Sequence, residues 1–141
     1  MRKAFFLTFC LLSASIMSMA QESRFKANIY NKVYDVEIVM NLNEESITIP
    51  GQEVLGKVFG YLKKKTDARV WAIMSAEISK DGKKAEVEMV NDYGSEDLNA
   101  ELTYNDDGTY TLRQLSGSTI KIANNKKWVK LPKELTFEAK K

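Results

Sequence analysis

Histidine is absent from this sequence, and its single cysteine, Cys10, lies near the N-terminus. Without histidine the chain has no imidazole base, no Ser-His-Asp triad and no zinc site built on histidine. If Cys10 is removed with a leader segment, the remaining chain forms no disulfide and offers no thiolate nucleophile. Its stability must then come from a hydrophobic core. These absences predict a protein that is not an enzyme and that holds neither a metal nor another cofactor.

The first twenty residues have the pattern of a cleavable secretory signal peptide. Arg2 and Lys3 supply positive charge, residues 4–17 are uncharged and mostly apolar, and residues 18–20 (Ser-Met-Ala) place small residues at a cleavage site. The apolar run is shorter than the roughly 20 residues that span a bilayer. We predict cleavage after Ala20, export to the periplasm or the extracellular space, and no stable membrane insertion afterwards.

Cys10 raises the alternative of a lipoprotein, in which a cysteine becomes the lipidated first residue. Phe9 precedes it where a small residue would be expected, and Cys10 lies inside the apolar run rather than at its end. These two features favour removal of Cys10 with the signal peptide.

Removal of the leader also changes the charge of the chain. Arg2 and Lys3 account for the whole net charge of +2, so residues 21–141 carry equal numbers of basic and acidic side chains. A neutral domain exerts no overall attraction on nucleic acid or on an anionic membrane. Nucleic acid is therefore not an expected partner, and the clusters Lys63-Lys64-Lys65 and Lys126-Lys127 are interpreted as solvated charges at turns or strand ends.

Alternation between apolar and polar residues is the dominant pattern of residues 21–141, and it predicts extended strands. The alternating or continuous apolar segments are 34–42, 47–49, 70–79, 84–90, 98–104, 109–113, 120–122 and 135–138. Asp81-Gly82 separates two of them and predicts a tight hairpin turn, and Asn105-Asp106-Asp107-Gly108 predicts a second, longer one.

Eight to ten short strands joined by tight turns predict an all-β, mainly antiparallel, single-domain meander over residues 21–141. Closure into a barrel removes the exposed edges of such a sheet, and a β-sandwich is the alternative. The segment 54–65 is ambiguous. Its apolar residues fit one face of a short helix, but Gly56 and Gly60 disfavour a helix interior and favour a bent strand.

Several segments resemble small secreted bacterial proteins with a lipocalin-like (calycin) barrel. They are Ile47-Thr48-Ile49-Pro50-Gly51, Gly56, Gly60, Trp71 at the start of a long hydrophobic strand, and Trp128-Val129-Lys130-Leu131-Pro132. The resemblance covers about residues 26–139. It implies a lipocalin-like barrel with a cavity for a small apolar molecule.

Two functions follow as hypotheses. The first is an exported module that binds an apolar or amphipathic small ligand, and the second is a non-catalytic structural or interaction protein of the cell envelope that acts through its surface. The candidate ligand-binding residues are inward-facing methionines and aromatic residues: Met40, Trp71, Met74, Met89 and Tyr104. Trp71 and Trp128 are expected in the core, with contact to a ligand as the alternative. The polar loop 91–97 is interpreted as a connection between strands rather than a calcium site.

Overall fold

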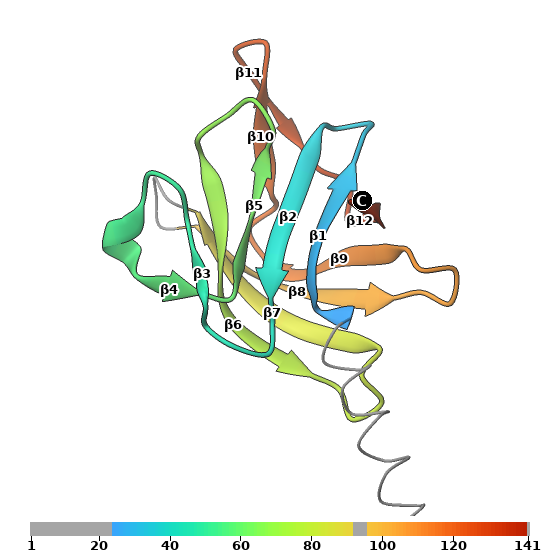
Figure 1. Ribbon diagram of the computed structural model, residues 1–141. Coiled ribbons are helices and arrows are strands. Elements are labelled where there is room, and N and C mark those ends of the chain that lie inside the picture. Colours follow the sequence, from blue (N-terminus) through green and yellow to red (C-terminus); the bar gives the residue numbers. More distant parts are fainter. Residues whose placement is uncertain (1–23, 92–95, 141) are drawn as a thin grey trace, which may run out of the picture.

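Eight antiparallel strands close into a barrel in the computed structural model of the protein, which describes residues 24–91 and 96–140 (Figure 1). The barrel strands are β1 (Lys26–Asn31), β2 (Val36–Asn41), β5 (Gly60–Lys64), β6 (Val70–Ile78), β7 (Lys84–Asn91), β8 (Asp97–Tyr104), β9 (Tyr110–Gly117) and β12 (Glu134–Ala139). Their order around the barrel follows the chain, and β1 closes it by pairing with both β2 and β12. The predicted antiparallel meander and its closure into a barrel are confirmed, and the sandwich alternative is not.

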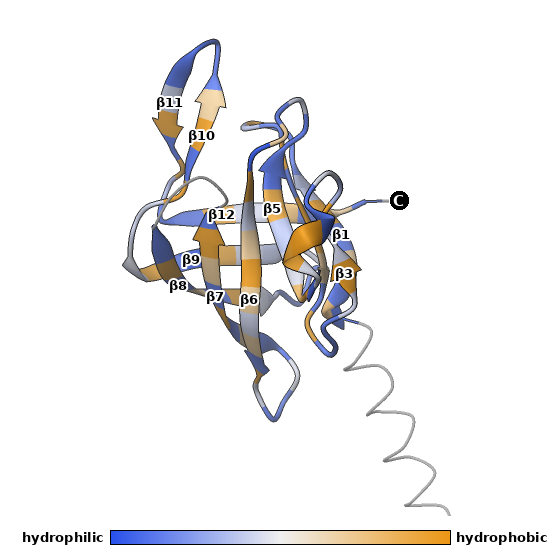
Figure 2. Ribbon diagram, turned by 90° about the vertical axis from the view of Figure 1, so that its left-hand side faces the viewer, coloured by the Kyte–Doolittle hydropathy of each residue, from blue (hydrophilic) through white to orange (hydrophobic). Residues whose placement is uncertain are grey.

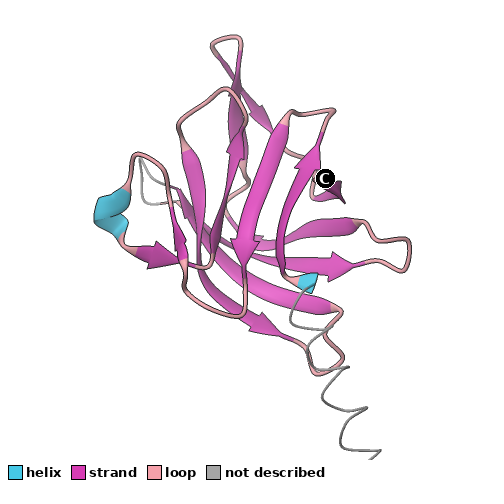
Figure 3. Cartoon of the chain, in the orientation of Figure 1, coloured by secondary structure: helices cyan, strands magenta, loops and turns pink. Residues whose placement is uncertain are grey.

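Two hairpins interrupt this meander without joining the barrel sheet. The first is formed by β3 (Ile47–Thr48) and β4 (Lys57–Val58), with the short 3-10 helix η1 (Glu53–Leu55) between them (Figure 3). The second is formed by β10 (Lys121–Asn124) and β11 (Lys127–Lys130), and it stands at one end of the barrel (Figure 1). We call this end the hairpin end.

The segment 54–65 is mostly extended, as favoured by its glycines, with η1 at its start. Gly60 lies where β2 and β5 approach closely, since a Cβ atom there would be 2.4 Å from the carbonyl oxygen of Val39. A residue with a side chain would push these two strands apart. The glycine is therefore required by the barrel wall.

Strand β6 contains a bulge that the alternation of its sequence did not reveal. The register with β7 shifts between Ile73 and Ser75, which leaves Met74 without an opposite residue. An extra residue of this kind reverses the faces of all residues beyond it. Trp71 and Ile73 consequently face the interior, whereas Met74 is 46% exposed. The expectation that Met74 faces inward is wrong because of this bulge, and Ala72, between Trp71 and Ile73, packs on the outer side of the barrel.

The outer side of β5 and β6 carries a second, smaller apolar cluster. Tyr61, Val70 and Ala72 pack there under Ile49 and Val58 from the β3–β4 hairpin. The apolar colour of the strands at this position is visible in Figure 2. This cluster explains why residues 70–73 are buried on both faces, as their continuous apolar run predicts.

Candidate functional site

The structure does not bring the five predicted ligand-binding residues together. Met40 and Met89 are buried in the barrel core, and Trp71 is buried with them at 3% exposure. Met74 lies outside because of the bulge in β6. Tyr104 lies at the end of the barrel opposite the hairpin, where its ring makes an edge contact with Tyr110.

The barrel interior is filled by side chains. Ile38, Leu62, Ile73, Met89 and Leu102 have essentially no exposed surface, and a water-sized void beside any of them would leave such surface. A ligand in the middle of this barrel would have to displace tightly packed side chains. The search for a binding site therefore moves to the ends and outer surfaces of the barrel.

The β10–β11 hairpin has one face toward the core and one face away from it. Ile122 and Val129 lie opposite each other in the hairpin and pack against the apolar core of the barrel. The other face carries Lys121 opposite Lys130, and the next pair on that face is Ala123 with Trp128. Because side chains alternate along each strand, burial of Ile122 presents these two lysines and the indole on the same side.

Three contacts hold this hairpin against the rest of the hairpin end. Lys64 Nζ donates a hydrogen bond to Asn124 Oδ1 over 3.0 Å. The guanidinium of Arg69 lies over the indole ring of Trp128, 4.7 Å from its centroid. On the opposite side Lys121 forms an ion pair with Glu96 over 3.8 Å. The hairpin is therefore tied both to the β5–β6 connection and to the start of β8.

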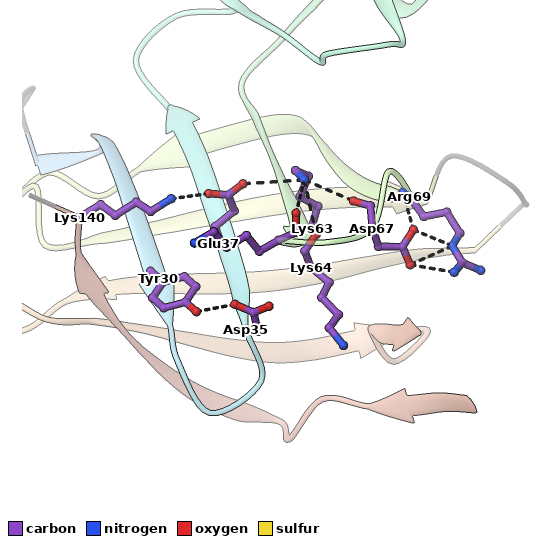
Figure 4. Close-up of polar contacts among 9 residues, drawn as sticks. Tyr30, Asp35, Glu37, Lys63, Lys64, Asp67, Arg69 and Lys140 are labelled. Carbon is purple, nitrogen blue, oxygen red and sulfur yellow. Dashed lines mark hydrogen bonds and ion pairs between the residues drawn. The ribbon is translucent and has the colours of Figure 1, made fainter. Parts of the chain in front are cut away.

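Arg69 is itself positioned by Asp67. Its Nε and Nη2 atoms donate to the two carboxylate oxygens over 3.0 Å and 2.7 Å, and Figure 4 shows this two-pronged contact. The hydrogen bonds from Arg69 lower the pKa of the Asp67 carboxyl below its usual 3.8, against a smaller opposing effect of burial. Figure 4 also shows Lys63, whose ammonium lies 4.0 Å from Glu37 and donates to the Asp67 carbonyl oxygen. This framework fixes the loop on which Trp128 rests.

A hollow of about 430 Å³ lies beside the outward face of the hairpin. Its walls include the half-exposed Trp128 together with Lys121, Lys130 and Glu96. A narrower space of about 10 Å³ adjoins it, with Lys121 and Trp128 in both walls and Trp71 in the wall of the inner space. An aromatic surface beside two cations favours a ligand with an apolar body and an anionic group.

The acidic residues of β6, β7 and β8 form a different surface. Glu77, Glu86 and Glu101 lie directly opposite one another on the outer side of the barrel, and Arg113 pairs with Glu101 over 3.4 Å. Among residues 24–91 and 96–140 no group of three or more acidic side chains is placed to hold a metal ion. The loop considered for calcium, residues 91–97, falls largely outside the described residues.

Sequence reasoning named Trp128 but expected it in the core, and it missed its neighbours. Trp128 is 51% exposed, so that expectation is wrong, and the alternative of ligand contact stays open. Arg69, Lys121 and Lys130 were not singled out from the sequence, and Glu96 was considered only as part of the polar loop 91–97. The signal available was the alternation in 121–130, which places both lysines on the face opposite Ile122. Their approach to Arg69 and Glu96 depends on tertiary packing.

Comparison with protein-family models, with curated proteins and with solved structures gave no significant match to this chain. In the part of the chain that the structure describes, no helix has the length and apolar character needed to cross a membrane.

Proposed function

We propose that this protein is an exported, non-catalytic binding protein for a small amphipathic anion, and that its site is the hollow at the hairpin end of a lipocalin-like barrel. The single observation that carries the proposal is a hollow of about 430 Å³ whose walls combine the half-exposed Trp128 with Lys121 and Lys130, which lie opposite each other in the hairpin. This volume lies within the range of about 300–1,000 Å³ that is typical of small-molecule sites. The packed interior gives the ligand no comparable space among the buried core residues.

The chemistry of the walls specifies the ligand class. The indole face of Trp128 offers a flat apolar surface, and the lysines attract a carboxylate, sulfonate or phosphate. Glu96 pairs with Lys121 across the hollow, so an anion would compete with that carboxylate for the ammonium group. Lys130 lies opposite Lys121 in the hairpin and supplies a second cation.

The test is a titration with 2-naphthoate, which has an aromatic body and one carboxylate. We expect saturable quenching of the tryptophan fluorescence and a dissociation constant in the micromolar range. Reversal of both charges in Lys121→Glu/Lys130→Glu should weaken binding at least tenfold, because the carboxylate then meets two repelling charges.

A matched control is the variant Lys80→Glu/Lys83→Glu, which reverses two exposed lysines at the β6–β7 turn on the opposite end of the barrel. It changes the net charge by the same amount and should leave affinity for 2-naphthoate unchanged. Equal loss in both variants would mean that the site is not at the hairpin end. Absence of saturable binding to the wild-type protein would contradict the proposal altogether.

The predicted signal peptide, residues 1–20, lies outside the described residues, so export needs a test of its own. We expect the chain expressed with its own N-terminus in a Gram-negative host to be recovered from the periplasm or medium. Its intact mass should correspond to a chain that begins at Gln21. A mass that includes Met1, or a lipid attached to Cys10, would contradict this part of the proposal.

A second candidate function rests on the exposed tip of the β3–β4 hairpin. Val54 is 95% exposed and Leu55 47% exposed in η1, and the apolar colour of this short helix is visible in Figure 2. Exposed apolar residues of this kind can contact a partner protein. If the protein acts through this surface, Val54→Ser/Leu55→Ser should abolish binding of the partner protein, and Lys121→Glu/Lys130→Glu should leave it unchanged. If the protein binds small anions, Lys121→Glu/Lys130→Glu should weaken binding of the anion, and Val54→Ser/Leu55→Ser should leave it unchanged.

A further inference from the structure

The outer side of β6 and β7 carries three exposed glutamates, which we call the glutamate face: Glu77, Glu86 and Glu88. Glu77 lies directly opposite Glu86, which in turn lies opposite Glu101 on β8. Like charges placed opposite each other on neighbouring strands destabilise a sheet. Arg113 pairs with Glu101, but in the described part of the chain none of the three glutamates forms an ion pair. The glutamate face therefore keeps unpaired negative charge at its surface.

The same side of the sheet exposes apolar side chains at two bulges. Met74 is the extra residue of β6, and Leu115 is the extra residue of β9. Their side chains are 46% and 45% exposed. A groove of about 250 Å³ crosses the strands from Ser75 on β6 to Leu115 on β9, and its walls include the three glutamates. A partner that fits this groove is basic and also has an apolar group.

The β10–β11 hairpin of the same protein has these complementary properties. It carries three exposed lysines, Lys126, Lys127 and Lys130, which we call the hairpin lysines. None of them forms an ion pair within the described residues. Trp128 lies between them in the sequence and is 51% exposed. The hairpin therefore offers positive charge and apolar surface where the glutamate face has negative charge and an open groove.

The hairpin and the glutamate face cannot meet within one molecule. Glu77 and Glu86 lie beside the β6–β7 turn, whereas the hairpin projects from the other end of the barrel (Figure 1). A contact between these surfaces must therefore join two copies. Residues 21–141 carry equal numbers of basic and acidic side chains, so no net charge opposes this association.

We infer that the partner of the glutamate face is a second copy of this chain, whose β10–β11 hairpin docks across the groove between β6 and β9. The hairpin lysines pair with the glutamates, and Trp128 packs in the groove beside Leu115. Because the two contacting surfaces differ, each copy uses both at once, and the copies assemble head to tail into a ring or an open chain. This inference goes beyond the proposed function, since Lys126 and Lys127 do not line the ligand hollow.

Sedimentation velocity of the chain without residues 1–20 tests the association directly. At about 0.1 M salt we expect the average mass to rise with concentration up to about 1 mM protein. At about 1 M salt the protein should be monomeric, because the Debye length falls from about 10 Å to about 3 Å. A monomer at every concentration in low salt would overturn the inference, and so would association that high salt leaves unchanged.

Charge reversal identifies the two surfaces. Glu77→Lys/Glu86→Lys and Lys126→Glu/Lys127→Glu should each weaken association at least tenfold, because like charges then meet in the contact. A variant with all four substitutions has the net charge of the wild type, and its acidic hairpin meets a basic face. It should associate again, and its failure to do so in a folded state would contradict the docking of these two surfaces.

Two control variants produce the same changes in net charge at exposed positions outside both surfaces. Glu44→Lys/Glu45→Lys lies in the β2–β3 connection, and Lys26→Glu/Lys133→Glu lies at the starts of β1 and β12. Both should associate as the wild type does. An equal loss in the controls would mean that net charge governs association, which would overturn the inference. Circular dichroism and thermal denaturation establish that each variant is folded.

A measurement on the wild-type protein decides the question if a reversal variant does not fold. The two indole N–H signals in a ¹H–¹⁵N spectrum are assigned with Trp128→Phe. Dilution should shift the Trp128 signal, which lies in the contact, and leave the signal of the buried Trp71 in place. An unmoved Trp128 signal over a range in which the mass changes would overturn the inference. The titration of dilute protein with 2-naphthoate is independent of this result, so the proposed function would still stand.

Discussion

The guanidinium of Arg69 lies over the indole of Trp128, with its central carbon 4.7 Å from the ring centroid. This contact joins the β5–β6 connection to the β10–β11 hairpin, two parts of the chain that are far apart in sequence. Asp67 holds Arg69 in place through Nε and Nη2. The position of the Trp128 ring, the proposed stacking surface for the ligand, therefore depends on Asp67, which does not line the hollow.

Arg69→Ala should loosen the hairpin. We expect a loss of about 0.5–1 kcal/mol in the free energy of unfolding, the usual contribution of an exposed cation–π contact. We also expect stronger quenching of Trp128 fluorescence by acrylamide, measured in a Trp71→Phe background so that Trp128 is the single indole. The control is Arg113→Ala, which removes an arginine paired with Glu101 on the far outer surface. If acrylamide quenches Trp128 fluorescence equally in both variants, Arg69 does not shield Trp128.

Met89→Ala and Met74→Ala should differ sharply in stability, although both methionines lie in strands with apolar neighbours. Met89 is fully buried, so its truncation should cost about 2–5 kcal/mol through lost burial and a residual cavity. Met74 is 46% exposed at the bulge, so its truncation should change stability by less than about 0.5 kcal/mol. Urea denaturation measures both. A large loss for Met74→Ala would contradict the bulge in β6.

The same comparison shows what alternation in a sequence can and cannot predict. Alternation and the Asp81-Gly82 turn predicted β6, β7 and their hairpin, because side-chain direction and turn chemistry are local properties. The bulge at Met74 was not predictable in this way. One extra residue leaves the local composition unchanged, while it moves every later side chain to the other face.

The candidate site was largely beyond prediction from the sequence because it is assembled from four separate segments. Lys121 comes from β10, Trp128 and Lys130 from β11, Glu96 from the residue before β8, and Arg69 from the β5–β6 connection. No pattern within any one segment shows that the others lie nearby. The half-exposed state of Trp128 also depends on the angle at which the hairpin leaves the barrel, which only tertiary packing determines.

Gly60→Ala should destabilise the barrel more than Gly51→Ala does. At Gly60 the new methyl group would lie 2.4 Å from the carbonyl oxygen of Val39 and 2.9 Å from Met40 Cα, both backbone atoms that can move only with their strand. We expect a loss of about 2–3 kcal/mol or more. Gly51 has a φ of +79° and open space around it, so alanine there should cost about 1 kcal/mol through backbone strain alone. Thermal denaturation ranks the two variants, and the reverse order would contradict the close approach of β2 and β5.

The ion pair of Asp67 with Arg69 should make stability depend on pH in the acid range. Hydrogen bonds from Arg69 lower the pKa of Asp67 in the folded protein below the value of 3.8 expected in the unfolded chain. The unfolded chain therefore takes up the proton first as the pH falls. The stabilisation from this carboxylate is complete above 3.8 and is lost as the pH falls through the lower, folded pKa.

Asp67→Asn removes this contribution at every pH. We expect its melting temperature to lie below that of the wild type by a constant amount above pH 3.8, and the gap to narrow as the pH decreases further. Asp106→Asn, at an exposed position in the β8–β9 turn, measures the effect of removing a carboxylate that does not contact Arg69. Because Asp67 orients Arg69 on Trp128, the Asp67→Asn variant should also show increased acrylamide quenching of Trp128 at neutral pH. If the difference in melting temperature between the wild type and Asp67→Asn stays the same at the lowest pH, the charge of Asp67 does not stabilise the folded protein.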